Sequence, residues 1–248
     1  TYLKNLGLEP NIVENDGSTP LHSLAFKEKD LEIFKLFLSA GADVNQADEE
    51  GNTPFLNAAA RNELAIVQLL YKDVKDINTP NKAGETALML AVQGNELAVV
   101  EFLLQKGADI NAQDTAGKTV AYFLAESFNK RKPAVFDAKV KVLKTKGLKF
   151  NTIQSDGNTL YHIAAKNNDL DLLKRVSDFS IDVNAKNDEG LTALHLAAMK
   201  AENDKMLKFL IAKGADTKST TDFEETVYDL ASENELLKKK NTSLNFLK

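Results

Sequence analysis

The amino-acid sequence predicts an all-α protein in which short helix–turn–helix units are stacked along the chain. The first observation is a Gly-x-Thr motif that recurs at nearly constant spacing, each copy leading into a short apolar run. The second is a further apolar run that ends in Gly-Ala-Asp-x-Asn, as at residues 41–45 and 107–111. Both motifs advance in phase along the chain. A fixed step of this kind is typical of repeat proteins, whose units bury apolar surface on their neighbours.

The Gly-x-Thr motif also sets the boundaries of the units. Its threonines are separated by 34, 33, 33, 40 and 33 residues, and a further copy at Thr226 carries Glu224 in place of the glycine. We therefore expect one repeat domain over residues 1–248, with repeats starting near 16, 50, 83, 116, 156 and 189. Residues 1–15 would be the tail of a preceding repeat, and residues 222–248 a C-terminal capping repeat. The motif threonines are Thr19, Thr53, Thr86, Thr119, Thr159 and Thr192.

Each motif threonine is expected to begin a helix. Its hydroxyl can accept a hydrogen bond from the free amides of the first turn, and Pro20 and Pro54 follow where a missing N–H costs nothing. The glycine before each threonine suits a turn with positive φ, and a second set of glycines can end the second helix. Between these two glycines we expect an extended, hairpin-like finger. Gly94 fits neither set, and we place it in the tight turn between two helices.

These motifs resemble those of the ankyrin repeat family, and the resemblance covers nearly the whole chain. The Thr-Pro-Leu-His signature is intact at residues 19–22 and has close variants at 159–162 and 192–195. The resemblance implies a solenoid that recognises another protein through its finger tips and concave groove. It also implies that three histidines tie adjacent repeats together by hydrogen bonds, in preference to an acid–base or metal-binding role. They are His22, His162 and His195.

Composition excludes several other classes of function. The chain has a net charge of −5. It contains no cysteine, and this excludes disulfides, a thiol nucleophile and cysteine-bound metals. The repeat uses the glycines and histidines, and the finger aspartates recur with its period as turn formers, so we expect no enzyme, no cofactor and no metal. An acidic chain without a run of roughly 18 apolar residues predicts neither nucleic-acid binding nor membrane insertion.

Candidate partner-binding residues lie at positions that are not needed for packing between repeats. In ankyrin repeats, residues beside the finger glycine and late in the first helix face the concave groove. An exposed Leu–Met pair among mixed charges there would suit a binding hot spot. Packing of these residues against a neighbouring finger is the alternative. The candidates are Phe26, Arg61, Leu191, Met199 and Lys200.

The 40-residue step carries seven extra residues at 127–133, and a basic segment follows. Residues 130–149 contain eight basic side chains and one acid, Asp137, a net charge of +7 that leaves −12 for the rest of the chain. Apolar residues at helical spacing predict the second helix at about 134–146. The segment could dock an acidic partner, could be a longer loop with a solvated helix face, or could be a nuclear-localisation signal. Its candidate contact residues are Phe128, Lys130, Arg131 and Lys132.

The remaining predictions concern context. Residues 2–11 align with 102–111, so we expect the chain to begin inside the second helix of an earlier repeat, or with a lone capping helix. The alternative function is therefore a targeting or scaffold segment of a longer multidomain enzyme or effector. Lysine outnumbers arginine 28 to 3, which together with the absence of cysteine favours a bacterial source. We expect a soluble monomer in the cytoplasm, in the periplasm or exported.

Overall fold

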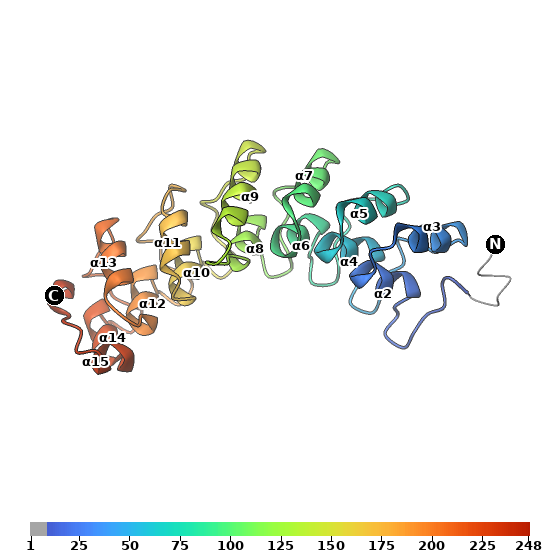
Figure 1. Ribbon diagram of the computed structural model, residues 1–248. Helices are drawn as coiled ribbons and strands as arrows, with labels where there is room; N and C mark the ends of the chain where they lie inside the picture. The colour runs from blue at the N-terminus through green and yellow to red at the C-terminus, as the bar shows by residue number, and fades with distance from the viewer. Residues whose placement is uncertain (1–8) are drawn as a thin grey trace. The chain divides into compact units, whose positions relative to one another are not determined.

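The computed structural model describes residues 9–248 as helix pairs joined by fingers (Figure 1). The chain divides into two compact units, residues 1–148 and 149–248. The segment predicted to be helical at residues 2–7 lies outside the described residues, and the assignment of 1–248 to one domain stays a prediction. The helices of the first unit are α2 Pro20–Lys27, α3 Leu31–Ser39, α4 Pro54–Arg61, α5 Leu64–Tyr71, α6 Ala87–Gly94, α7 Leu97–Gln105, α8 Val120–Glu126 and α9 Pro133–Thr145.

The second unit repeats the same pattern. A first helix in each pair is followed by a second helix, and the last pair is the shortest. The helices are α10 Leu160–Lys166, α11 Leu170–Val176, α12 Ala193–Lys200, α13 Lys205–Ala212, α14 Val227–Glu233 and α15 Glu235–Lys239, followed by the 3-10 turn η1 Asn245–Leu247. The all-α stack of helix pairs predicted from the repeat is therefore confirmed.

Within the first unit the helices form two rows. The first helices α2, α4, α6 and α8 each pack on the next, and so do α3, α5, α7 and α9 (Figure 1). Small side chains let neighbouring first helices pack closely. Among them, Ala25, Ala58 and Ala91 are completely buried. Gly94 is the last residue of α6 and not part of the turn that we predicted. A Cβ there would lie 2.6 Å from the carbonyl oxygen of Ala60, so glycine is needed for the approach of α6 to α4.

The fingers end in tight turns that contact one another. At the tip of one finger, Gly51 N–H donates to the Asp48 carbonyl at 3.0 Å, and Asp48 N–H donates to the Asn52 carbonyl at 2.9 Å. Gly51 has a φ of 79°, and a Cβ there would lie 2.7 Å from the nitrogen of Lys82 in the next finger. The glycine therefore serves both the left-handed turn and the contact between fingers.

A finger asparagine links each of several repeats to the next. Asn45 donates to the carbonyl of Asp73 at 2.9 Å, and its side-chain oxygen accepts from Lys75 N–H at 3.1 Å. Asn11 makes the same kind of pair with Gly41 and Asp43, at 2.7 and 2.9 Å. The described end of the first finger thus has the register that the sequence alignment predicts.

Further asparagines tie the helix pairs together. Each follows a first helix and donates its side-chain amide to carbonyls at the C-terminal end of the preceding first helix. The bonds, all 2.8–3.0 Å long, run from Asn62 to Ala25 and Glu28, from Asn95 to Ala59 and Asn62, and from Asn234 to Ala198 and Ala201. Helix ends leave carbonyls without intrahelical partners, so these bonds satisfy groups that would otherwise be buried unpaired.

Candidate protein-interaction surface

Two predicted contact residues of the first unit lie against each other. Phe26 in the last turn of α2 is 51% exposed, and the guanidinium carbon of Arg61, at the end of α4, lies 5.4 Å from the centre of its ring. This is cation–π geometry, which contributes about 0.5–1 kcal/mol at exposed sites. The pair holds a large apolar face and a positive charge at one place on the surface.

The other predicted groove residues belong to the second unit, at opposite ends of α12. Met199 is 44% exposed and Lys200 is also exposed, both in the last turn of the helix. Leu191 is half-buried and precedes the N-cap Thr192. From the first residue of α12, Ala193, to Met199 the helix rises by about 9 Å, and Leu191 lies two residues before that start. Leu191 also offers its carbonyl to His162, so its backbone is part of the stacking.

The inserted segment forms an ordered turn. Lys132 N–H donates to the Asn129 carbonyl at 2.8 Å, and Arg131 N–H donates to the Asn129 side chain at 2.9 Å. Lys130, Arg131 and Lys132 are exposed. Phe128 is half-buried and packs edge-on against the buried Phe136, with ring centres 5.2 Å apart. Phe128 therefore packs the turn against α9, and the three cations are the exposed candidate residues of this segment.

The three histidines have one geometry in three repeats. In the first, Nδ1 of His22 accepts from the backbone N–H of Thr19 at 3.0 Å, so the proton of the neutral ring is on Nε2. Nε2 donates to the carbonyl of Asn52 in the next repeat, also at 3.0 Å. His162 and His195 donate in the same way to the carbonyls of Leu191 and Ser219, at 2.9 and 3.0 Å.

Burial shapes the titration of two of these rings. His162 is 1% exposed and His195 is completely buried. Desolvation lowers the pKa of both below the ordinary value of 6.5, and the hydrogen bond to the carbonyl opposes this in part. A proton on Nδ1 would also break the bond from the threonine N–H. The neutral form is thus the one that joins the repeats.

The threonines of the motif cap their helices. The hydroxyls of Thr53, Thr86, Thr119 and Thr192 accept hydrogen bonds from the amide three residues on, at 3.2–3.5 Å. The hydroxyls of Thr19, Thr159 and Thr192 lie 2.9 Å from Nδ1 of the histidine in their own repeat. In both arrangements the threonine fixes the start of the first helix, and in the histidine repeats it also orients the ring.

One exposed fingertip residue is not among the predicted contact residues. Phe223 is 83% exposed, the largest value among the large apolar side chains of the described residues. It occupies the fingertip position just before the motif glycine, which here is Glu224. The corresponding residues in the other fingers are small or acidic: Asp16, Glu50, Ala83, Ala116, Asp156 and Glu189. A comparison of this one position across the repeats would have identified it.

A second missed residue is Lys139, on α9. Its side chain is 4% exposed, and its ammonium donates to the carbonyls of Val92 at 2.8 Å and Ala91 at 3.5 Å. Burial lowers the pKa of Lys139 from 10.5 to about 8. A small cavity of about 250 Å³ lies beside it, lined also by Lys132 and Asn95. The sequence pattern gave no sign of this role, because Lys139 stands among lysines that are exposed.

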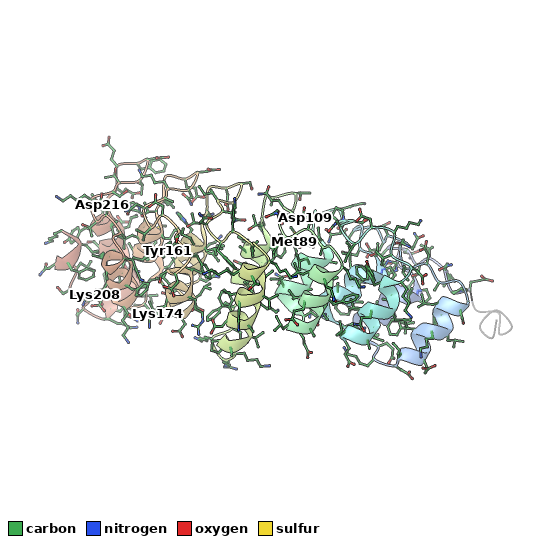
Figure 2. The ribbon with its side chains drawn as sticks, turned by 90° about the horizontal axis from the view of Figure 1, so that it is seen from above. Met89, Asp109, Tyr161, Lys174, Lys208 and Asp216 are labelled. Atoms are coloured by element: carbon green, nitrogen blue, oxygen red, sulfur yellow. The ribbon has the colours of Figure 1, made fainter. Side chains whose placement is uncertain are left out.

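The fingers and the second helices occupy different sides of the second unit. Figure 2 shows the finger residue Asp216 on one side, and Lys174 of α11 and Lys208 of α13 on the other. The unit thus offers a finger side and a helix side to other molecules. Over residues 9–248, no cluster of three or more acidic or histidine side chains could hold a metal ion. No helix in the same range has the length and apolarity needed to cross a membrane.

Stacked helix pairs with intervening fingers define a repeat protein of the helical solenoid class. The sequence profile described as "Ankyrin repeats (3 copies)" matches residues 1–81, 23–114 and 134–221, which is more than half of the chain. The chain belongs to the ankyrin repeat family. Only ankyrin repeats are detected in it, and such domains are generally protein-interaction modules without catalytic activity.

Individual relatives agree with this assignment. An ankyrin repeat protein of Rickettsia felis is 37% identical over 76 residues, which cover 28% of this chain and 34% of the relative. The chain thus spans about a third of the length of that curated protein. The crystal structure of the human ASB11 ankyrin repeat domain has a TM-score of 0.72 and covers 89% of this chain and 96% of its own. Its sequence identity is 20%, so this likeness concerns the fold alone.

Proposed function

We propose that this ankyrin array binds a partner protein through apolar side chains on its finger tips and on the ends of its first helices. The observation that carries the proposal is the exposure of large apolar side chains where stacking does not use them: Phe223 at 83%, Phe26 at 51% and Met199 at 44%. Aromatic and methionine side chains are enriched at the centres of protein interfaces. Each of these residues has charged neighbours, which suits a polar rim.

Binding is the whole activity in this proposal, and no bond is made or broken. The fold does not determine the partner, because recognition depends on surface residues that stacking leaves free. The alternative role, a targeting or scaffold segment of a longer enzyme or effector, stays a prediction. A bacterial source is supported by the relative from Rickettsia felis.

The test is an affinity capture from bacterial extract with three forms of the protein. Met199→Glu should lose the captured partner, because burying an unpaired charge in a desolvated contact is strongly unfavourable. Leu236→Glu is the matched control: Leu236 is also 44% exposed but lies on the second helix α15. Circular dichroism and Tm should be unchanged in both variants.

Each outcome has a defined meaning. A protein retained by the wild type and by Leu236→Glu, and lost by Met199→Glu, supports the proposal. Equal loss of the captured protein in both variants would show that binding depends on surface apolarity in general and not on Met199. Equal retention of the captured protein would show that Met199 is not part of the interface. We use Met199 without Leu191, because Leu191 is half-buried and a charge there could disturb the fold.

A further inference from the structure

The second helices of the first unit enclose a groove that the finger and first-helix surface does not include. Its volume is about 820 Å³, and it is lined by residues of α5, α7 and α9. In Figure 1 these three helices follow one another in the row of second helices, with α7 in the middle. α7 therefore forms the floor of the groove, and α5 and α9 form its walls.

Apolar side chains make up half of the lining of the groove, and the uncharged polar ones are Gln68, Gln105 and Thr145. α7 contributes Ala98 and Phe102, which lie on one face because they are four residues apart, and also Leu97, which is one residue before Ala98. From the walls come Leu64 of α5 and Val142 of α9. Ala98 is exposed although apolar, and its small side chain leaves the floor open.

Charge on the groove is unevenly distributed. Lys141 and Lys146 line it from α9, and the ammonium of Lys106 lies 5.7 Å from the centre of the Phe102 ring. Glu101 is the one acidic lining residue. Residues 130–146 carry seven basic side chains and one acidic one, a net charge of +6 in a chain whose total is −5. The groove thus joins an apolar floor to the most basic segment of an acidic protein.

We propose that this groove binds a short amphipathic helix of a partner protein, with apolar residues on one face and acidic residues beside them. A helix is favoured over a strand because the floor and both walls are helices, and helices offer no unpaired sheet edge to which a strand could bind. α7 has nine residues, a rise of about 13 Å, so a docked helix of two to three turns would match its length. Acidic side chains of the partner would pair with Lys141 and Lys146.

This surface is separate from the one in the proposed function, and the two can be tested independently. The probe is a fluorescein-labelled peptide of about fourteen residues, with leucine at i, i+3, i+4 and i+7 and glutamate at flanking positions. One control peptide has lysine in place of every glutamate, and another has serine in place of every leucine. Fluorescence anisotropy with the full 248-residue chain gives the affinities.

The glutamate peptide should bind, and both control peptides should bind at least about tenfold more weakly. Lys141→Glu combined with Lys146→Glu should reduce binding by a similar factor, and added salt should reduce it in the wild type. Lys144→Glu is the matched control, because Lys144 is exposed on the same helix but does not line the groove. Its affinity should stay close to that of the wild type.

Ala98→Arg tests the apolar floor by filling it. Loss of binding with an unchanged Tm is the expected result, and the double lysine variant keeps the test valid if Ala98→Arg does not fold. Absence of binding, equal affinity for the lysine peptide, or undiminished binding to both groove variants would overturn the proposal. Self-association of the free chain that Ala98→Arg abolishes, seen by sedimentation, would instead assign the groove to a second copy.

Discussion

The ammonium nitrogen of Lys139 lies 2.8 Å from the carbonyl oxygen of Val92. Val92 belongs to the third repeat and stands six residues after its motif threonine, Thr86. In the preceding repeat the carbonyl six residues after the threonine is that of Ala59, and the Asn95 side chain donates to it at 3.0 Å. The fourth repeat has Phe128 at the asparagine position, so a lysine from the second helix supplies the missing donor. The insertion therefore changes which residue makes the link and preserves the link itself.

A first prediction concerns the pH dependence of this link. The pKa of Lys139 is about 8 in the folded protein and near its ordinary value of 10.5 in the unfolded chain. Between these values the unfolded state binds more protons, so the free energy of unfolding should rise with pH across this window. The rise should be at most about 3 kcal/mol, at 1.36 kcal/mol per pKa unit.

Urea unfolding of the wild type and of Lys139→Met, at pH values spanning that window, measures the effect. The rise should be absent in Lys139→Met and retained in Lys144→Met, which removes an exposed lysine from the same helix. A parallel pH dependence in all three proteins would show that Lys139 keeps its ordinary pKa.

A second prediction concerns acid sensitivity through the histidines. Burial lowers the pKa of His162 and His195 below 6.5, so just below pH 6.5 the unfolded state binds more protons. The free energy of unfolding should therefore fall as pH decreases through this range. Above the range the histidines are neutral, and their contribution to stability is complete. His162→Gln should flatten the dependence, and should cost about 1–3 kcal/mol above pH 7 because buried groups lose their partners.

Denaturant unfolding near pH 5 and near pH 8 checks this prediction. The loss on acidification should be smaller in His162→Gln than in the wild type. A double variant with His195→Gln should reduce it further. If both variants lose as much stability as the wild type, carboxylates and not the histidines control acid unfolding.

A third prediction follows from the left-handed residues that stand in glycine positions. Glu224 has a φ of 62° where the other motifs have glycine, and a side chain there costs about 1–2 kcal/mol of strain. Glu224→Gly should raise the free energy of unfolding by about 1 kcal/mol, and Tm by about 2 °C. Gly157→Ala should act in the opposite direction, because its Cβ would lie 2.7 Å from the nitrogen of Asp188. Thermal melts compare both variants, and an unchanged or lower Tm for Glu224→Gly would contradict the strain.

A fourth prediction concerns the cations of the inserted turn. Replacing Lys130, Arg131 and Lys132 with serine should slow association with the captured partner at low salt and have little effect at high salt, since exposed charges act through screened long-range attraction. Stopped-flow measurements at two salt concentrations give the rates. The control replaces Lys239 and Lys240, two exposed cations near the C-terminus, with serine. A rate equal to that of the wild type at both salt concentrations would leave the turn with a structural role alone.

Much of the fold follows from local sequence signals. The motif threonine and its glycine locate each first helix, and the apolar spacing placed the second helix of the fourth repeat at 134–146, against the observed α9 at Pro133–Thr145. These features are local because a cap, a left-handed turn and a helical periodicity each depend on a few consecutive residues. The pairing of Phe26 with Arg61 was accessible in part, because both residues were selected as lying late in a first helix, although their contact was not predicted.

The sequence by itself determined the repeat, its period, the family and the class of function, because each repeat specifies its helices by its own residues. Only the tertiary structure showed that Phe128 packs on Phe136, that Gly94 admits the approach of α4, and that Lys139 is buried among carbonyls. The contacts of Gly94 and Lys139 join residues of different repeats, and the contact of Phe128 depends on how the inserted turn folds back on α9. Exposure likewise depends on what neighbouring repeats cover. An exposed lysine and a buried one are identical in sequence, and only the position of Lys139 beside the carbonyls of Ala91 and Val92 in α6 distinguishes it from the exposed lysines of α9.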